Sequence, residues 1–126
     1  MVSVFDIGRI VNTRGARSQL LGGMIMGVSM ALHEHLEMDP RFGDFANHDL
    51  ASYHFAAHAD IHGLEAHWID ETDHELNPMR TKGAGEIGIV GASAAVANAV
   101  YHASGVRVRD LPITIEKVHP ALTSPR

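Results

Sequence analysis

The chain has 126 residues, of which 45% are hydrophobic and 20% are charged, and this predicts one globular domain with a modest core. The formal net charge of −5 provides no basic surface, so nucleic acid is not expected as a partner. The absence of cysteine excludes disulfides, thiolate zinc sites, cysteine nucleophiles and iron–sulfur ligation within this chain.

The first part of the chain predicts a strand followed by a long helix. Residues 2–7 alternate loosely and are rich in β-branched and aromatic side chains, which indicates a short strand. After a polar loop, Ser18 is the expected N-cap of a helix that runs to about Met38. Gly23 and Gly27 lie one turn apart in this helix, and each costs about 1 kcal/mol relative to alanine. We therefore expect another backbone to pack closely on this patch.

The rest of the chain predicts short elements joined by loops. In chain order they are a turn at 39–43, a mostly irregular stretch at 44–59, a strand at 64–69, a helix from Ile87 or Ser93 to Ser104 with Gly105 after its end, a strand at 111–115, and a loose tail from His119. Asn98, inside the second helix, is expected to bond to a neighbouring backbone group. Two main helices with a few short strands indicate an α+β fold.

No membrane span or leader is predicted. The longest apolar run, Leu20 to Leu32, is shorter than the roughly 20 residues that a spanning helix needs. The segment from Met1 to Arg9 lacks the charged start and the long apolar stretch of a signal peptide.

A glycine-rich stretch from Lys82 to Gly91 surrounds a single carboxylate, Glu86. Glycines let a backbone approach another group closely, and the start of a helix favours an anion. From the residues alone, Glu86 is either a loop side chain facing water or a positioned base. Gln19, expected near the start of the first helix, is likewise either a solvated side chain or a grip for a polar ligand edge.

Three of the ten histidines, His54, His58 and His62, are four residues apart. On a helix they would share one face and could hold zinc or nickel with Asp60 or Glu65. Loop signals flank the segment, and on a strand this spacing is too wide for a shared ion. The main interpretation therefore includes no metal ligand from this chain, and a histidine-rich metal-binding module stays as an alternative.

These pieces occur in the order of a known family's motifs. They are Asp6-x-Gly8, Asn12, Ser18-Gln19-x-x-Gly22-Gly23-x-x-x-Gly27, Ala31-Leu32-x-Glu34, Gly43, Asn47-x-Asp49-Leu50-x-x-Tyr53, Asp60, Asn77-Pro78, Lys82-Gly83-x-Gly85-Glu86, Ala95-x-x-Asn98-Ala99, and Gly105-x-Arg107-x-x-x-Leu111-Pro112-Ile113-Thr114. With these residues the chain resembles the C-terminal part of the molybdenum-binding large subunit of the molybdenum hydroxylases, the xanthine dehydrogenase and aldehyde oxidase family. Its segments Asp70-Glu71-Thr72-Asp73 and Glu86-Ile87-Gly88-Ile89-Val90-Gly91 are most similar to the periplasmic aldehyde oxidase branch.

The resemblance implies roles for particular residues. Glu86 would act as general base, taking the proton of a molybdenum-bound hydroxide that attacks the substrate carbon while hydride passes to the metal centre. Gln19 would contact the pterin of the molybdenum cofactor. The backbone of Lys82, Gly83, Ala84 and Gly85 would run close to the metal centre.

The resemblance also implies an incomplete site. Residues 1–118 would be a piece of a larger molybdopterin-binding domain, and residues 119–126 a tail. The rest of the subunit would supply most cofactor contacts, and other subunits or domains would carry iron–sulfur clusters and FAD. The expected substrates are aldehydes or, second, N-heterocycles, with no turnover by this chain alone.

Three further points stay open. Thr13, Ala56, His62 and Arg80 stand where this branch often has proline or glycine. A non-catalytic assembly fragment that docks on a partner is an alternative to the enzyme interpretation. The compartment also stays open between cytoplasm and periplasm, because a subunit of this branch can be exported with a partner that bears the signal.

Overall fold

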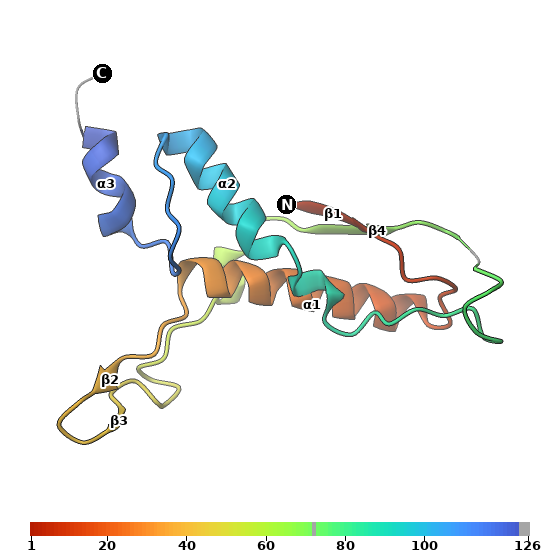
Figure 1. Cartoon of the computed structure of the whole chain (residues 1–126), viewed down its shortest axis with the longest axis horizontal. Coiled ribbons are helices and arrows are strands. Elements are labelled where there is room, and N and C mark those ends of the chain that lie inside the picture. The colour runs from red at the N-terminus through yellow and green to blue at the C-terminus, as the bar shows by residue number, and fades with distance from the viewer. Residues whose placement is uncertain (72, 124–126) are drawn as a thin grey trace.

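The computed structural model describes residues 1–71 and 73–123 (Figure 1). Its elements are β1 (Val2–Phe5), α1 (Thr13–Leu32), β2 (Met38–Asp39), β3 (Asp44–Phe45), the 3-10 helix η1 (His58–Asp60), β4 (Glu65–Trp68), the 3-10 helix η2 (Ile87–Ile89), α2 (Ala92–Ser104) and α3 (Ile115–Thr123). Helix α1 runs along the molecule, the β1–β4 pair lies beside it, and α2 and α3 rise from its C-terminal half (Figure 1). The predicted α+β fold is confirmed, with a third helix added.

Helix α1 begins earlier and ends earlier than predicted. Its N-cap is Asn12, which has an extended backbone and whose side-chain oxygen accepts the free N–H of Gly15 at 2.9 Å. The predicted cap Ser18 is wrong, because it lies within the helix. The helix ends at Leu32, and Met38 belongs to β2. The sequence analysis placed a loop at the first turn of α1 because its residues are polar and include a glycine. This turn is helical, because the Asn12 side chain accepts the free N–H of Gly15.

Asn12→Ala should lower the free energy of unfolding of this chain by about 1 kcal/mol, because the Gly15 amide loses its acceptor. Ser18→Ala is the matched control and should leave stability unchanged or slightly higher, since alanine favours a helix interior. Urea unfolding followed by circular dichroism measures both. A larger loss from Ser18→Ala than from Asn12→Ala would contradict the assigned cap.

The glycine patch of α1 is covered by backbone, as expected from the sequence. A Cβ added to Gly23 would lie 2.8 Å from the Cα of Gly88 in η2. A Cβ added to Gly27 would overlap the side chain of Ala92 at the start of α2. The Ser93 hydroxyl then donates to the Gly27 carbonyl at 2.8 Å. These contacts offset the low helix propensity of the two glycines and fix the segment after the glycine-rich stretch on α1.

Strands β1 and β4 form a two-stranded parallel sheet, in register from Val2 opposite Glu65 to Phe5 opposite Trp68. Both predicted strands are confirmed, although each is shorter than expected. Their inward side chains join α1 in the core, whose buried members are Phe5, Ile7, Leu20, Met24 and Ala66. This small core brings the end of β1 and the middle of α1 to the glycine-rich stretch.

A hairpin arm, residues 38–45, extends away from the body of the molecule (Figure 1). Strands β2 and β3 pair antiparallel, and Gly43 takes a left-handed φ of 67° in the turn. The Asn47 side chain accepts from the backbone N–H of Glu37 at 2.8 Å and closes the base of the arm. The chain then returns along α1, where Ala56 N–H donates to the Ser29 hydroxyl at 2.9 Å. The arm is thus tied to the end of α1.

The end of α2 is held by a cap and by an arginine. Gly105 lies at φ 76° and donates its N–H to the Tyr101 carbonyl at 2.7 Å, which confirms the expected helix end. The guanidinium of Arg107 lies 3.8 Å from the centroid of the Tyr101 ring. It also donates to the Asn98 side-chain oxygen at 2.7 Å. The predicted backbone bond of Asn98 is therefore wrong; its partner is a side chain.

The C-terminal segment differs from the prediction. Residues 111–115 form no strand; the Ile113 N–H instead donates to the Ala31 carbonyl of α1 at 2.7 Å. Helix α3 starts at Ile115, so the expected tail from His119 is helical as far as Thr123. Lys117 donates to the backbone carbonyls of Asp110 and Pro112, which fixes the turn before the helix. The remainder of the expected tail, 124–126, lies outside the described residues.

One segment of the described chain, Ile87–Ser104, has the length and apolar composition of a membrane-spanning helix. The segment is not one helix, because Gly91 at φ 82° separates η2 from α2. The 13 residues of α2 extend for about 20 Å, less than the roughly 30 Å of a bilayer core. Length and composition alone therefore overstate how well this segment could span a membrane.

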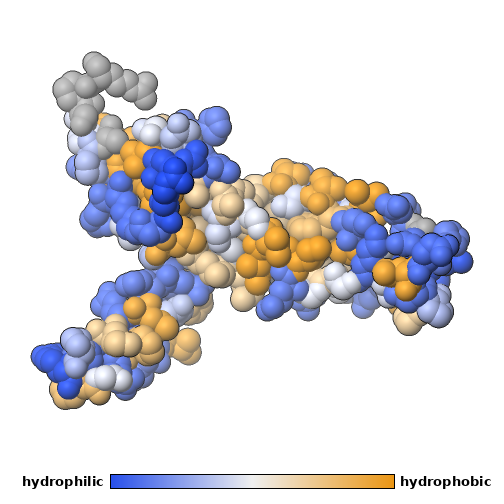
Figure 2. Space-filling view, viewed as in Figure 1, coloured by the Kyte–Doolittle hydropathy of each residue, from blue (hydrophilic) through white to orange (hydrophobic). Residues whose placement is uncertain are grey.

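Apolar side chains gather on the surface over β1, α1 and the segment just before α2 (Figure 2). Exposed members include Val2, Val4, Met26, Met30 and Val90, the last with 79% of its surface accessible. Contiguous apolar surface of this kind marks contact with other polypeptide.

Candidate functional site

The glycine-rich stretch starts beside the residues that follow β1 and ends in contact with α1. Gly8 and Thr81 form an isolated antiparallel bridge, and Lys82 N–H donates to the Ile7 carbonyl at 3.1 Å. Farther on, Gly88 is buried against the Leu20–Gly23 turn of α1. The loop between Lys82 and Gly88 is therefore fixed at both ends.

Inside this loop, the side chains divide into inward and outward sets. Ala84 and Ile87 pack against the core, whereas Gly83, Gly85 and Glu86 are exposed. A Cβ added to Gly83 or Gly85 would meet no atom within 4 Å. The backbone here is open to close approach by another group.

Glu86 is exposed at the start of η2. Its carbonyl accepts from Ile89 N–H at 3.0 Å, and its side chain makes no capping hydrogen bond. Gly91, at a left-handed φ of 82°, lies between Glu86 and the first residue of α2. The carboxylate therefore does not sit at the N-terminus of the long helix, as the sequence suggested, but on the loop before it.

Gln19 also differs from its expected position. Helix α1 starts at Thr13, so Gln19 lies in the second turn and not beside free amides. It is exposed and lies one turn before Gly23, the residue that packs on Gly88. The fold thus brings the turn of α1 that bears Gln19 and the loop that bears Glu86 to neighbouring positions, although they are far apart in the sequence.

The Lys82 ammonium is paired with a carboxylate of this chain. It forms an ion pair with the Asp6 carboxylate at 2.5 Å, and the other Asp6 oxygen accepts from Gly8 N–H at 3.2 Å. The hydrogen bond from Lys82 lowers the pKa of Asp6, and the same bond raises the pKa of Lys82. Asp6 is a residue to which the sequence analysis gave no role. The Asp6-x-Gly8 motif was visible, but its partner Lys82 could be found only from the fold.

Arg80 has an unusual backbone conformation, with φ 60°. A non-glycine residue in this region costs on the order of 1–2 kcal/mol. The cost is offset locally, because Arg80 N–H donates to the Asn77 carbonyl at 3.0 Å and Arg80 carbonyl accepts from Arg9 N–H at 2.8 Å. The departure noted in the sequence, where this branch often has proline or glycine, is therefore accommodated without breaking the bridge to β1.

The three spaced histidines do not form a helical face. His58 opens the short 3-10 helix η1, and His54 and His62 lie outside it. Within residues 1–71 and 73–123, no group of three His, Asp or Glu side chains is arranged to hold a metal ion. The histidine-rich metal-binding alternative thus has no preformed site in the described chain.

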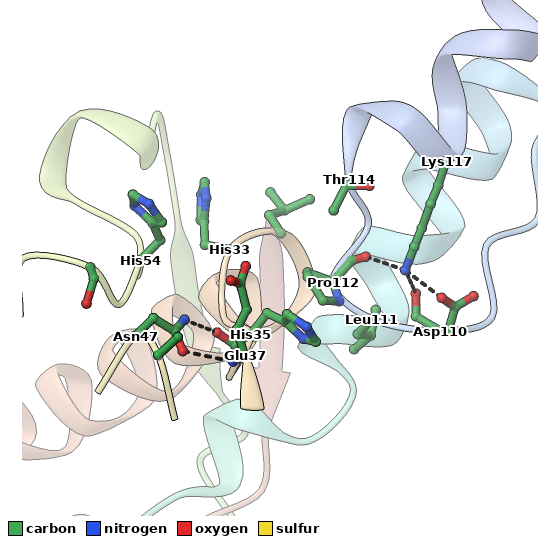
Figure 3. A pocket seen from close by; sticks show the side chains of 13 residues that line it. His33, His35, Glu37, Asn47, His54, Asp110, Leu111, Pro112, Thr114 and Lys117 are labelled. Carbon is green, nitrogen blue, oxygen red and sulfur yellow. Dashed lines mark hydrogen bonds and ion pairs between the residues drawn. The ribbon is translucent and has the colours of Figure 1, made fainter. Parts of the chain in front are cut away.

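A hollow of about 740 Å³ opens between the end of α1, the base of the hairpin arm and the start of α3 (Figure 3). Its polar lining includes His33, His35 and His54. Lys117, its cation, directs all three donors to Asp110 and to the Pro112 carbonyl, at 2.5 to 3.0 Å (Figure 3). This leaves the ammonium no donor for a ligand. Neither Glu86 nor Gln19 lines this hollow.

The chemistry of the residues expected to face a cofactor suits the polar edge of a pterin. Gln19 offers an exposed amide donor and acceptor, and Gly83 and Gly85 leave backbone open to close approach. Glu86 is exposed on the same loop as the two glycines.

The chain is similar to known molybdenum-binding proteins. A family model for the molybdopterin cofactor-binding domain matches residues 1–62. The aldehyde oxidoreductase molybdenum-binding subunit of Escherichia coli (strain K12) is 52% identical over 118 residues, which are 94% of this chain and 16% of that subunit. The putative xanthine dehydrogenase molybdenum-binding subunit of the same organism is 33% identical over 119 residues, with coverages of 94% and 16%.

A solved structure shares the fold. The aldehyde oxidoreductase from Desulfovibrio gigas superposes with a TM-score of 0.82 and 29% identity, covering 98% of this chain and 13% of that one. The chain thus spans about a sixth of the length of the curated relatives named above.

Proposed function

Because this chain belongs to the molybdenum-binding subunits of the xanthine dehydrogenase and aldehyde oxidase family, we propose that it forms one wall of the active site of an aldehyde-oxidising enzyme. The observation that carries the proposal is the loop from Lys82 to Gly88. It is fixed at both ends, and between them it exposes one carboxylate flanked by glycines. N-heterocycles are the second substrate class.

Each exposed residue of this face has a proposed task. Glu86 accepts a proton at its carboxylate during substrate oxidation, which requires an ionised group within hydrogen-bond reach of that proton. Gln19 binds the polar edge of the pterin through its amide. The backbone of Lys82 to Gly85 borders the cofactor, with Gly83 and Gly85 leaving room for its approach. When bound, the molybdenum cofactor supplies two-electron oxidation of the substrate with oxygen from water.

The proposed partners follow from what this chain lacks. Without cysteine it holds no iron–sulfur cluster, so we assign the iron–sulfur clusters and FAD to other subunits or domains. The exposed apolar surface over β1, α1 and the segment just before α2 fits contact with the rest of the molybdenum-binding subunit (Figure 2). The proposal includes neither nucleic acid nor a membrane span.

A chimaeric holoenzyme tests the function. In it, this chain replaces the aligned segment of the Escherichia coli aldehyde oxidoreductase subunit, to which it is 52% identical. We expect the chimaera to contain molybdenum and to reduce a dye with an aldehyde as donor. A folded, molybdenum-loaded chimaera that oxidises no aldehyde would contradict the proposal, and one that oxidises only a heterocycle would replace it with the second substrate class.

The isolated chain is expected to give no aldehyde-dependent dye reduction, because its site has a single wall. The measurement combines molybdenum analysis of the purified chain with a dye-reduction assay. The chimaeric holoenzyme is the positive control. Stoichiometric molybdenum together with turnover by the isolated chain would show that the missing walls are not needed.

A further inference from the structure

The end of β1 and the start of the glycine-rich loop are joined by backbone bonds. Arg9 N–H donates to the Arg80 carbonyl at 2.8 Å, and Lys82 N–H donates to the Ile7 carbonyl at 3.1 Å. Gly8 lies between these bonds at φ 62°, opposite Thr81. The loop therefore starts from a short antiparallel pairing and not from a free segment.

The Lys82 side chain adds an ion pair to the backbone hydrogen bonds that join these two segments. It crosses Gly8 closely, because a Cβ added there would lie 3.2 Å from the Lys82 Cγ and 2.7 Å from the Arg80 carbonyl oxygen. The ammonium then reaches Asp6 at 2.5 Å, and Asp6 in turn accepts from Gly8 N–H. Both side chains are partly buried, with 26% of Lys82 and 38% of Asp6 exposed. The ion pair therefore joins the two segments a second time, next to the Gly8–Thr81 bridge.

Beyond Lys82, the loop has little else to hold it. Gly83 and Gly85 bring no side chains, and Ala84 alone packs on the core before Ile87. Glu86 stands between the Lys82 end and the Gly88 contact with α1. Its position depends on both ends of the loop staying in place.

We propose that the Asp6–Lys82 ion pair is a positioning device that holds the Lys82 end of the loop and so sets where the Glu86 carboxylate stands. The proposal rests on the proposed function for the role of Glu86. It assigns the Lys82 ammonium to Asp6 and leaves only the backbone of Lys82 beside the cofactor. The directions of the pKa shifts of Asp6 and Lys82 agree with a pair that stays charged near neutral pH.

The test uses the chimaeric holoenzyme with Asp6→Asn, Lys82→Gln and the double variant. Each single variant should lower kcat about ten- to a hundredfold, as expected for a misplaced reacting group, with KM and molybdenum content near those of the parent. The double variant should be no worse than either single one, because the partners act as a unit. Asp39→Asn, which breaks the ion pair with Arg41 on the hairpin arm, is the matched control and should leave kcat unchanged.

Hydrogen exchange gives a readout that does not depend on turnover. Amides of the segment 82–90 should exchange faster in Asp6→Asn and Lys82→Gln, and not in Asp39→Asn. Lys82→Arg keeps the charge and should retain slow exchange and a kcat within a few fold of the parent. If Asp6→Asn does not fold, Lys82→Arg decides: fast exchange or lost turnover in that variant overturns the positioning role.

Other outcomes separate the alternatives. Additive losses in the double variant would overturn the coupling of Asp6 with Lys82. Loss of molybdenum from Lys82→Gln but not from Asp6→Asn would assign the ammonium to the cofactor instead. If the parent chimaera oxidises no aldehyde, the proposed function fails, whereas the exchange measurement still decides whether the pair holds the loop.

Discussion

Glu86→Gln in the chimaeric holoenzyme is expected to lower kcat by about 10²- to 10⁴-fold while the molybdenum content stays at the parent level. The reason is chemical, because the amide has nearly the shape of the carboxylate but cannot take up a proton. The exposed position of Glu86, without a capping hydrogen bond, means that the substitution removes no contact that stabilises the described chain. Folding and loading should therefore be unaffected.

The matched control is Glu75→Gln, a second exposed glutamate in the segment between β4 and the glycine-rich loop. It should leave kcat and molybdenum content unchanged. Steady-state kinetics with metal analysis on the same preparations separate chemistry from assembly. Parent-level kcat in the Glu86→Gln enzyme would remove this residue from the reaction.

Gly23→Ala is expected to destabilise this chain, and Gly22→Ala is expected to stabilise it. The two neighbours differ in what a methyl group would meet: the Cα of Gly88 at 2.8 Å for Gly23, and no atom within 4 Å for Gly22. Alanine gains about 1 kcal/mol of helix propensity at either position. At Gly23 the overlap with buried backbone costs about 1–3 kcal/mol, and it cannot be relieved by turning a side chain.

Urea unfolding of the two variants and the parent measures the difference between neighbouring positions of one helix. Equal stability of Gly23→Ala and Gly22→Ala would contradict the close packing of η2 on α1. In the chimaeric holoenzyme, Gly23→Ala should also lower kcat, because Gly88 and the loop that bears Glu86 must move away from α1.

Patterns of neighbouring residues predicted the main elements well. The strands around Val4 and Ala66 were identified from their composition, and the Gly23–Gly27 patch from its spacing. Helix ends were less predictable, because Asn12 and Ser18 are equally good caps and only the Asn12–Gly15 bond distinguishes them. At the C-terminus, β-branched residues around Ile113 suggested a strand, but a bond to Ala31 and the Lys117 turn favour α3 instead.

The roles of the candidate site residues stay predictions. Family motifs pointed to Glu86, Gln19 and the Lys82–Gly85 backbone, and the contact of Gly88 with Gly23 brings the loop that bears Glu86 to the part of α1 that bears Gln19. The pairing of Lys82 with Asp6 could not be read locally, since it joins the two ends of a long stretch of chain through the β1 bridge. Long-range contacts of this kind are set by tertiary structure and leave no spacing signal.

The two-stranded sheet has a consequence for handling this chain. Within the described residues neither β1 nor β4 has a second neighbour, so both outer margins keep unpaired N–H and C=O groups. Parallel strands are ordinarily enclosed within larger sheets, and a pair alone is barely stable in water. These open margins offer a template on which a second copy can add a strand. The isolated polypeptide should therefore be handled at low concentration, and co-expression with the covering segments should raise the fraction that is recovered as monomer.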